Sequence, residues 1–263
     1  MSSYVPLALR YYNVILIGVL IASAYIQWTR RTTWTCRWES GTTFCGICCT
    51  IGLTLGSPFV REKVWPELGL MDELLPIPQI LGDSAILLGM AAFLYSLAHR
   101  LDIDEDERAR WLNRNITLPC TLISPTMIGA FYSPLCSDTV IDSLIAAAFA
   151  WWIWQIGRLL VIIYMTDPRS RNIMRAYIAC CGLALLSGAE RILGIVYGID
   201  YMRHAWGLTA FAACGFGITS AISWQLKQRH LKTGLWRKVR RGRATHADAL
   251  KTRKQPKPEM ECF

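Results

Sequence analysis

The sequence predicts an all-α membrane protein, a polytopic bundle of seven transmembrane helices with the N-terminus outside and the C-terminus inside. Hydrophobic residues make up 53% of the 263-residue chain and charged residues only 18%, against about 25% charged in a typical soluble domain. The apolar residues collect in long runs, and the cationic residues fall between these runs in a regular alternation. Eleven tryptophans and ten tyrosines suit a protein that anchors many helix ends at membrane interfaces.

Seven apolar runs are long enough to cross a bilayer. A helix needs about 20 predominantly apolar residues to span a hydrocarbon core of roughly 30 Å. A single missed or added span would invert every loop that follows it. The predicted spans are residues 12–28, 42–59, 77–98, 117–135, 140–165, 176–199 and 205–224.

The distribution of Lys and Arg predicts the orientation, because these residues accumulate in cytoplasmic loops. The first, third and fifth loops and the C-terminal tail hold 22 of the 28 Lys and Arg residues. The N-terminal segment and the other loops hold four, and Arg158 and Arg191 lie inside predicted spans. This alternation requires an odd number of spans, so we expect a multi-pass protein of the cell membrane with a cytoplasmic C-terminus.

The first span has an alternative interpretation as a signal peptide. Ala22, Ser23 and Ala24 form an AxA-like cleavage site after an apolar stretch. Only Arg10 precedes that stretch, whereas Arg30 and Arg31 follow it and would oppose export. We therefore expect an uncleaved helix.

Two segments outside the spans are rich in charge. The third loop, residues 99–115, contains the acidic run 102–107 and is expected to form a short amphipathic segment at the membrane interface. The transmembrane domain is predicted over residues 1–226, and residues 227–263 are predicted to be a basic, mostly disordered cytoplasmic tail. Because the basic residues flank apolar runs, the net charge of +9 indicates anionic lipid headgroups rather than nucleic acid as the partner. The expected lipid-binding residues of the tail are Arg237, Lys238, Arg240, Arg241 and Arg243.

Four ionisable residues fall inside the predicted spans: Asp83, Arg158, Glu190 and Arg191. Such side chains cost roughly 2.5–3.5 kcal/mol each on insertion scales, so each needs a partner or a use. Helical rise places Asp83 and Glu190 at one level of the membrane, and Asp83 is expected to pair with Arg191 or to share a polar cavity with both. Arg158 is close enough to the inner end of its helix to extend toward cytoplasmic water.

This polar cluster has two interpretations. The charges form a structural ion pair that locks helices together, or they line a path for a substrate or for protons. The fourth span favours the second interpretation weakly, because Pro119 and Pro125 are expected to kink it and broken helices line binding sites in transporters. Proline is also common in transmembrane helices that only pack against neighbours.

The residues that would indicate an enzyme, a metal centre or a cofactor do not form a recognisable pattern. The sequence contains no P-loop, GxSxG or HExxH motif. Cys45, Cys48 and Cys49 include a CxxC, but it lies inside an apolar run without a matching pair, so we interpret these residues as small packing side chains. No catalytic residue, metal or cofactor is therefore expected. Gly194 and Gly198 have the GxxxG spacing, which favours close helix packing within the bundle or a homodimer.

The seven-span layout also resembles a known family. Residues 53–58 read Leu-Thr-Leu-Gly-Ser-Pro at the end of the second span, and a long polar loop precedes the third. In these features the chain is similar to an uncharacterised family of actinobacterial seven-helix membrane proteins, often labelled as transporters and also present in prophages. The likeness covers roughly residues 12–228, and this chain lacks the larger cytoplasmic C-terminal portion that members usually carry.

Two function hypotheses follow. The protein is transporter-like or channel-like, with a water-reachable cavity at the intramembrane charges. Alternatively, it is a non-catalytic interaction or regulatory protein of the membrane, encoded by a mobile element or prophage, with buried, paired charges and a membrane protein partner.

Overall fold

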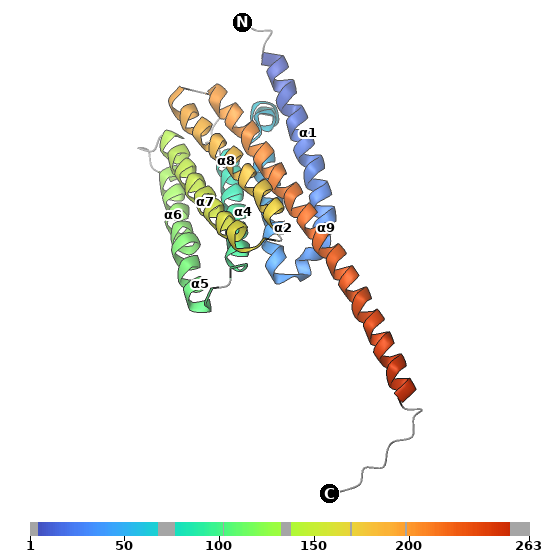
Figure 1. Ribbon diagram of the computed structural model, residues 1–263. Coiled ribbons are helices and arrows are strands. Elements are labelled where there is room, and N and C mark those ends of the chain that lie inside the picture. The colour runs from blue at the N-terminus through green and yellow to red at the C-terminus, as the bar shows by residue number, and fades with distance from the viewer. Residues whose placement is uncertain are drawn as a thin grey trace. The chain divides into compact units, whose positions relative to one another are not determined.

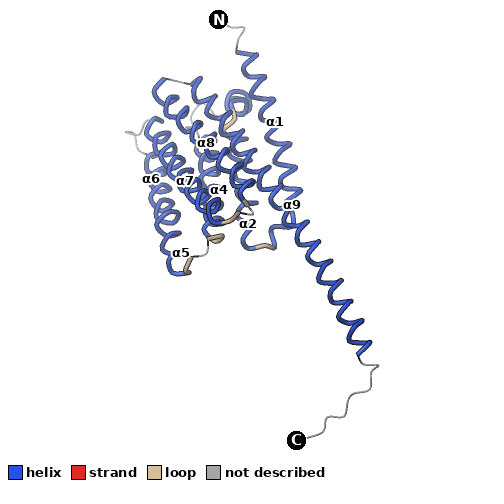
Figure 2. Tube along the Cα trace, viewed as in Figure 1, coloured by secondary structure: helices blue, strands red, loops and turns tan. Residues whose placement is uncertain are grey.

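The computed structural model describes residues 5–67, 77–101, 103–132, 138–168, 170–197 and 199–252. Within these ranges every regular element is a helix and no strand occurs (Figures 1 and 2). The all-α prediction is therefore confirmed. The structure divides into two compact units, residues 1–221 and residues 222–263.

Long α-helices joined by short 3₁₀ and π segments make up the first unit. Each of the long helices contains or overlaps a predicted apolar run, with ends shifted by up to seven residues, except that α9 continues 28 residues beyond its run into the second unit. The elements are α1 (Val5–Arg30), a 3₁₀ turn (Arg31–Thr35), α2 (Arg37–Leu55), a π segment (Val60–Val64), α3 (Trp65–Glu67), α4 (Ile77–Ala98), α5 (Glu105–Leu112), a second π segment (Asn113–Thr117), α6 (Leu118–Tyr132), α7 (Asp138–Thr166), α8 (Arg171–Tyr197) and α9 (Ile199–Thr252).

Five of the described helices are long and apolar enough to cross a membrane, and a sixth candidate is bent. The bent candidate joins residues 39–55 to residues 60–67 at an angle of 47°. The fourth predicted span corresponds to α6, of which the structure describes 15 residues, fewer than a bilayer requires. The end of that predicted span, residues 133–135, lies outside the described residues. The structure thus gives five to six candidate spans, and the seventh stays a prediction.

Glycines bring α2 and α4 into close contact. A Cβ on Gly52 would collide with the carbonyl oxygen of Gly82, and a Cβ on Gly89 would lie 3.0 Å from the Cβ of Cys48 and 3.1 Å from the carbonyl oxygen of Cys45. Small residues allow backbones to approach where lipid offers no hydrophobic drive for association. Cys45 and Cys48 therefore pack as small side chains at a helix contact.

The core of the first unit lies where α4, α7, α8 and the N-terminal half of α9 meet. The rings of Phe93, Tyr177 and Phe216, one from each of α4, α8 and α9, have centroids 5.6–5.8 Å apart, a favourable separation for aromatic pairs. The helices α2 and α4, α4 and α7, and α7 and α8 pack side by side (Figure 1). In this arrangement side chains from distant parts of the sequence share one interior.

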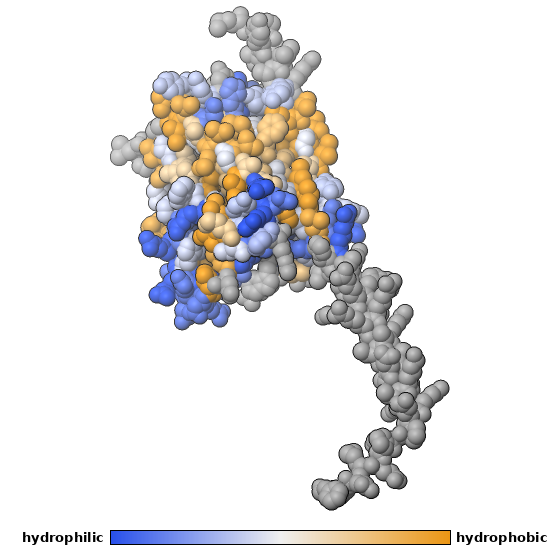
Figure 3. All heavy atoms as spheres, viewed as in Figure 1, coloured by the Kyte–Doolittle hydropathy of each residue, from blue (hydrophilic) through white to orange (hydrophobic). Residues whose placement is uncertain are grey.

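The outer surface of the bundle is strongly apolar. Figure 3 shows apolar residues over the middle of the bundle and hydrophilic residues gathered around α5. Val14, Ile17 and Ile21 of α1 are each more than half exposed. Large exposed apolar surfaces need a nonaqueous environment or a partner, which agrees with the spans assigned by length and hydropathy.

The second unit consists of the continuation of α9 and the residues that follow. The helix α9 extends to Thr252, so residues 227–252 are helical where the sequence predicted a mostly disordered tail. Lys, Arg and Ala are good helix formers, and they are frequent up to residue 252. The side chains of residues 237–243 lie outside the description, so lipid binding by the tail stays a prediction.

Candidate functional site

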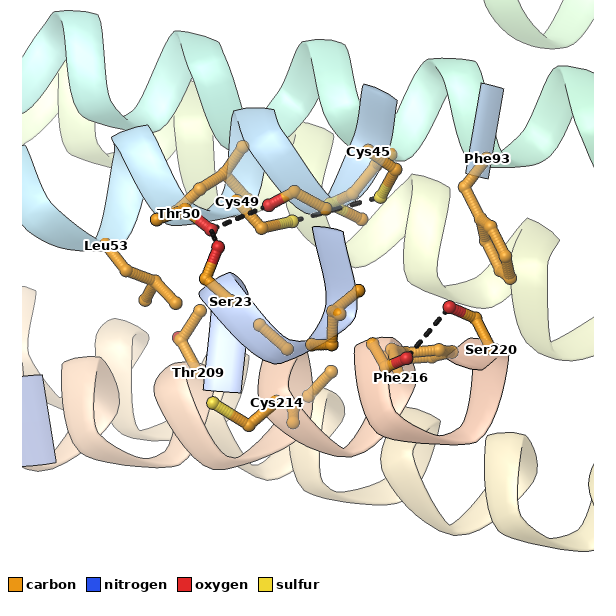
Figure 4. Close-up of a pocket in the computed structure, with 18 of the residues that line it drawn as sticks. Ser23, Cys45, Cys49, Thr50, Leu53, Phe93, Thr209, Cys214, Phe216 and Ser220 are labelled. Atoms are coloured by element: carbon orange, nitrogen blue, oxygen red, sulfur yellow. Dashed lines mark hydrogen bonds between the residues drawn. The ribbon is translucent and has the colours of Figure 1, made fainter. Parts of the chain in front are cut away.

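A small cavity lies inside the first unit and is lined by side chains from six helices (Figure 4). Its volume is about 80 Å³. The α2 helix contributes Cys45, Cys49 and Leu53, and α9 contributes Cys214 and Phe216. The cavity is therefore mainly apolar and is shared by helices that are distant in sequence.

Most hydroxyl groups at this cavity already have partners, and the exception in the described structure is Thr42, whose Oγ1 is buried without one. Ser23 and Thr50 are hydrogen-bonded across the α1–α2 contact at 2.6 Å, and Thr50 also donates to the carbonyl of Gly46 at 2.8 Å. Ser220 donates to the carbonyl of Gly217 at 2.8 Å (Figure 4). Few polar groups remain to hold water, and apolar cavities of this kind stay dry. The lining of this space suits a small apolar guest better than a polar one.

An ion pair lies beyond one end of the cavity. The Arg191 guanidinium on α8 donates to the Asp83 carboxylate on α4 at 2.5 Å. Along α4, Asp83 precedes the first lining residue, Ile86, by three residues, or about 4.5 Å. Both side chains are mostly buried, with 10% and 17% of their surfaces exposed. The predicted pairing of Asp83 with Arg191 is thus present in the structure, and Asp142 of α7 also attracts Arg191.

The other two predicted charges do not join this pair. Within the described residues, one carboxylate oxygen of Glu190, Oε2, is buried without a hydrogen-bond partner. Arg158 is exposed on α7 and lines a separate groove with α5. The four residues therefore do not form one continuous polar path.

A second buried cluster lies beyond the opposite end of the cavity, around Glu39 at the start of α2. Its carboxylate accepts one hydrogen bond from Arg30 at 2.8 Å and another from Arg100 at 3.0 Å. Arg30 is only 1% exposed. Its guanidinium also donates to the Thr43 hydroxyl at 3.0 Å and to the Ser220 carbonyl at 2.9 Å. One arginine thereby links α1, α2 and α9, and Glu39 extends the link to the end of α4.

The sequence did not predict this cluster. Arg30 and Arg100 were interpreted as cations of cytoplasmic loops, and Glu39 was not singled out. Arg30 and Glu39 flank the short turn between two spans, and a carboxylate this close to an apolar run is a usable signal. The contribution of Arg100, which is 61 positions from Glu39, depends on the packing of α4 against α2.

Pro119 lies just after a π segment, and neither proline reaches the cavity. Proline has no N–H, so it leaves the carbonyl four residues earlier without its helical donor. The backbone before Pro119 is a π segment, in which the N–H of Leu118 bonds to the carbonyl of Asn113, five residues earlier. In this segment the carbonyl of Asn115 accepts the indole N–H of Trp152 at 3.0 Å, which joins the segment to α7. Pro125 lies inside α6.

The predicted close packing at Gly194 is present within the chain, because a Cβ on Gly194 would lie 2.7 Å from Met202 of α9. Gly198 lies outside the described residues.

The fold and the two clusters define a class: an all-helical protein with several helices suited to a membrane and with ion pairs buried among them. Comparisons with protein-family models, curated proteins and solved structures found no match to this chain. The resemblance to actinobacterial seven-helix proteins therefore stays a prediction, and the function is inferred from the geometry.

Proposed function

We propose that this chain is a seven-span protein of the cell membrane that is not an enzyme and that acts by binding another membrane component. The observation that carries the proposal is the pairing of the interior charges. Asp83 is paired with Arg191, and Glu39 with Arg30 and Arg100. The space between these clusters is small and apolar, which supports a structural role for the charges over a transport path.

The contacts at the two ends of the bundle support the proposed orientation. Arg30, Glu39 and Arg100 meet at one end, and these are the residues of the first and third loops and their borders. Glu62 and Arg203, from the second and sixth loops, form an ion pair of 2.7 Å. Odd-numbered loops thus contact each other, and even-numbered loops contact each other, as an alternating topology requires. The odd-numbered loops are the cation-rich ones, which are assigned to the cytoplasm.

Fusion reporters test the topology. A fluorescent protein that matures only in the cytoplasm is attached after residue 67, after residue 103 or at the C-terminus of the full chain. We expect fluorescence from the second and third fusions and none from the first. Fluorescence after residue 67 would overturn the orientation.

Native mass spectrometry of the tagged full-length protein, gently extracted in detergent, tests the mode of action. We expect a stoichiometric membrane partner that is retained by the wild type and by Asp83→Asn. A small molecule or ion that is bound by the wild type and lost in Asp83→Asn, but kept in the control Glu62→Gln, would replace the binding proposal with transport.

Glu190 favours transport as the second candidate function. Its carboxylate oxygen Oε2 is buried without a partner in the described structure and belongs to the residue next to Arg191, and ionisable residues inside spans mark ion or proton pathways. Proton flux in liposomes that disappears in Glu190→Gln would establish this alternative.

A further inference from the structure

A groove on the outside of the first unit has the composition of an anion site. It lies between α7 and the continuous segment formed by α5 and the following π segment, and its volume is about 410 Å³. Three arginines line it, together with two tryptophans, two amides and one carboxylate. These residues are Arg110, Arg114, Arg158, Trp111, Trp151, Asn115, Gln155 and Glu107.

The groove is held open by defined contacts. The hydrogen bond from Trp152 to the carbonyl of Asn115 fixes the level of α7 against the π segment. The Asn115 amide donates to the carbonyl of Trp111 at 2.8 Å, and Trp111 packs against the core. The walls are therefore two anchored helices rather than a loop.

The cationic groups of the groove are available for a ligand. Within the described residues, Arg114 and Arg158 form no hydrogen bond or ion pair. Arg110 donates only to the carbonyl of Asp106 on its own helix, at 3.4 Å. Glu107, the carboxylate of the groove, is exposed and forms no ion pair with the described arginines. The lining therefore carries a net charge of +2 that the described structure does not neutralise.

Gln155 provides the second observation. It is 3% exposed, lines the groove and has no hydrogen-bond partner in the described part of the chain. Its amide is not one of the fully buried groups without a partner, so it is open to the groove and can donate a hydrogen bond to a ligand oxygen there. Guanidinium groups bind phosphate oxygens in pairs, with more geometric specificity than an ammonium.

We propose that this groove binds the phosphate group of a phosphate ester, with Arg114 and Arg158 as the principal ligands and Gln155 as a further donor. Two sources share this chemistry: an anionic phospholipid headgroup and a soluble phosphate ester. Arg158 and Trp151 belong to the candidate span 142–166, and Arg158 lies eight residues, or about 12 Å, before the end of α7. Basic pockets between transmembrane helices on the cytoplasmic side bind lipid headgroups. The depth rests on the proposed topology, whereas the chemistry of the groove does not.

Native mass spectrometry of the full-length protein in detergent, with added phosphatidylglycerol or phosphatidylcholine, tests the lipid source. Titration with glycerol 3-phosphate tests the soluble source. The double variant Arg114→Gln/Arg158→Gln is expected to bind the preferred ligand roughly ten- to thirtyfold more weakly, since each arginine near an anionic surface contributes about 1 kcal/mol. The matched control is Arg31→Gln/Arg171→Gln, which removes two exposed arginines from outside the groove and should leave the affinity unchanged.

Gln155→Leu provides an independent check, because it removes the unpartnered amide without adding charge. We expect several-fold weaker binding with an unchanged unfolding midpoint. Selective loss of phosphatidylglycerol assigns the groove to a lipid, and selective loss of glycerol 3-phosphate assigns it to a soluble ester. The proposal would be overturned if the groove variants bound phosphatidylglycerol as tightly as the wild type and the control do, and also bound glycerol 3-phosphate as tightly as they do. The fusion reporters test the topology separately, so the two proposals can fail independently.

Discussion

The Nη2 atom of Arg30 on α1 lies 2.8 Å from Oε2 of Glu39 on α2, and the arginine is almost completely buried. The pair spans a turn of only eight residues and yet is completed from two other helices, by Arg100 at the end of α4 and by the Ser220 carbonyl of α9. Each of the three guanidinium nitrogens of Arg30 donates to at least one acceptor in this arrangement. A buried cation of this kind is tolerated only while its partners are present.

Removing the Glu39 charge should therefore destabilise the bundle. In Glu39→Gln two arginines remain without a counter-charge, and losing one member of a buried pair costs about 3–5 kcal/mol. We expect the thermal unfolding midpoint in detergent to fall by roughly 10 °C. The control is Glu62→Gln, whose ion pair with Arg203 is more exposed and should contribute about 1 kcal/mol or less. Equal midpoints for the two variants would contradict this assignment.

The Asp83–Arg191 pair is best tested by a double-mutant cycle. Asp83→Asn leaves Arg191 without its partner, and Arg191→Gln does the same to Asp83, so each single variant should be clearly less stable than the wild type. The double variant should be less destabilised than the sum of the two, with a coupling of about 1–3 kcal/mol. Thermal unfolding of the four proteins in one detergent gives the comparison, and additive effects would mean that the pair does not stabilise the fold.

The sequence predicted those features that depend on one segment of the chain, and it missed most of those that depend on contacts between distant segments. An apolar run identifies a helix by itself, so α1, α4, α7 and α8 lie where hydropathy placed them. An ionisable residue inside such a run also stands out, and the shared level of Asp83 and Arg191 follows from helical rise. The residues of the Glu39 cluster lie at the ends of apolar runs, where charged residues are common. Only the packing of α2 on α4 shows that Arg100, and not another cation of the loops, is the partner of Glu39.

The groove and the tail show the same limitation. Arg158 was grouped with the intramembrane charges because of its sequence position, but α7 turns it outward toward α5. The helical continuation of α9 to Thr252 was missed because a cation-rich segment with few apolar residues has the composition of a disordered tail. The Lys, Arg and Ala residues of this segment have high helix propensity. A prediction based on charge and hydrophobic content alone does not take this propensity into account.

Two glycines with opposite surroundings give a matched pair of variants. A Cβ on Gly52 would meet the carbonyl oxygen of Gly82 and lie 2.5 Å from the Ile86 side chain, whereas a Cβ on Gly18 would meet nothing within 4 Å. Gly52→Ala should therefore force α2 away from α4 and cost about 1–3 kcal/mol. Gly18→Ala should be neutral or stabilising by up to about 1 kcal/mol, because alanine is the better helix former. The unfolding midpoints decide, and a stabilised Gly52→Ala would show that the two helices are less closely packed than described.

The contact between Trp152 and Asn115 should depend on Pro119. The Asn115 carbonyl accepts the indole N–H of Trp152, and Trp152→Phe removes this hydrogen bond at a buried residue, which should cost about 1–3 kcal/mol. In a Pro119→Ala background the alanine restores the backbone N–H, and the same Trp152→Phe change should then cost markedly less. The unfolding midpoints of the wild type, both single variants and the double variant measure this difference. If Trp152→Phe were equally destabilising in both backgrounds, the indole would stabilise the bundle by packing alone, and the proline would have no part in joining α6 to α7.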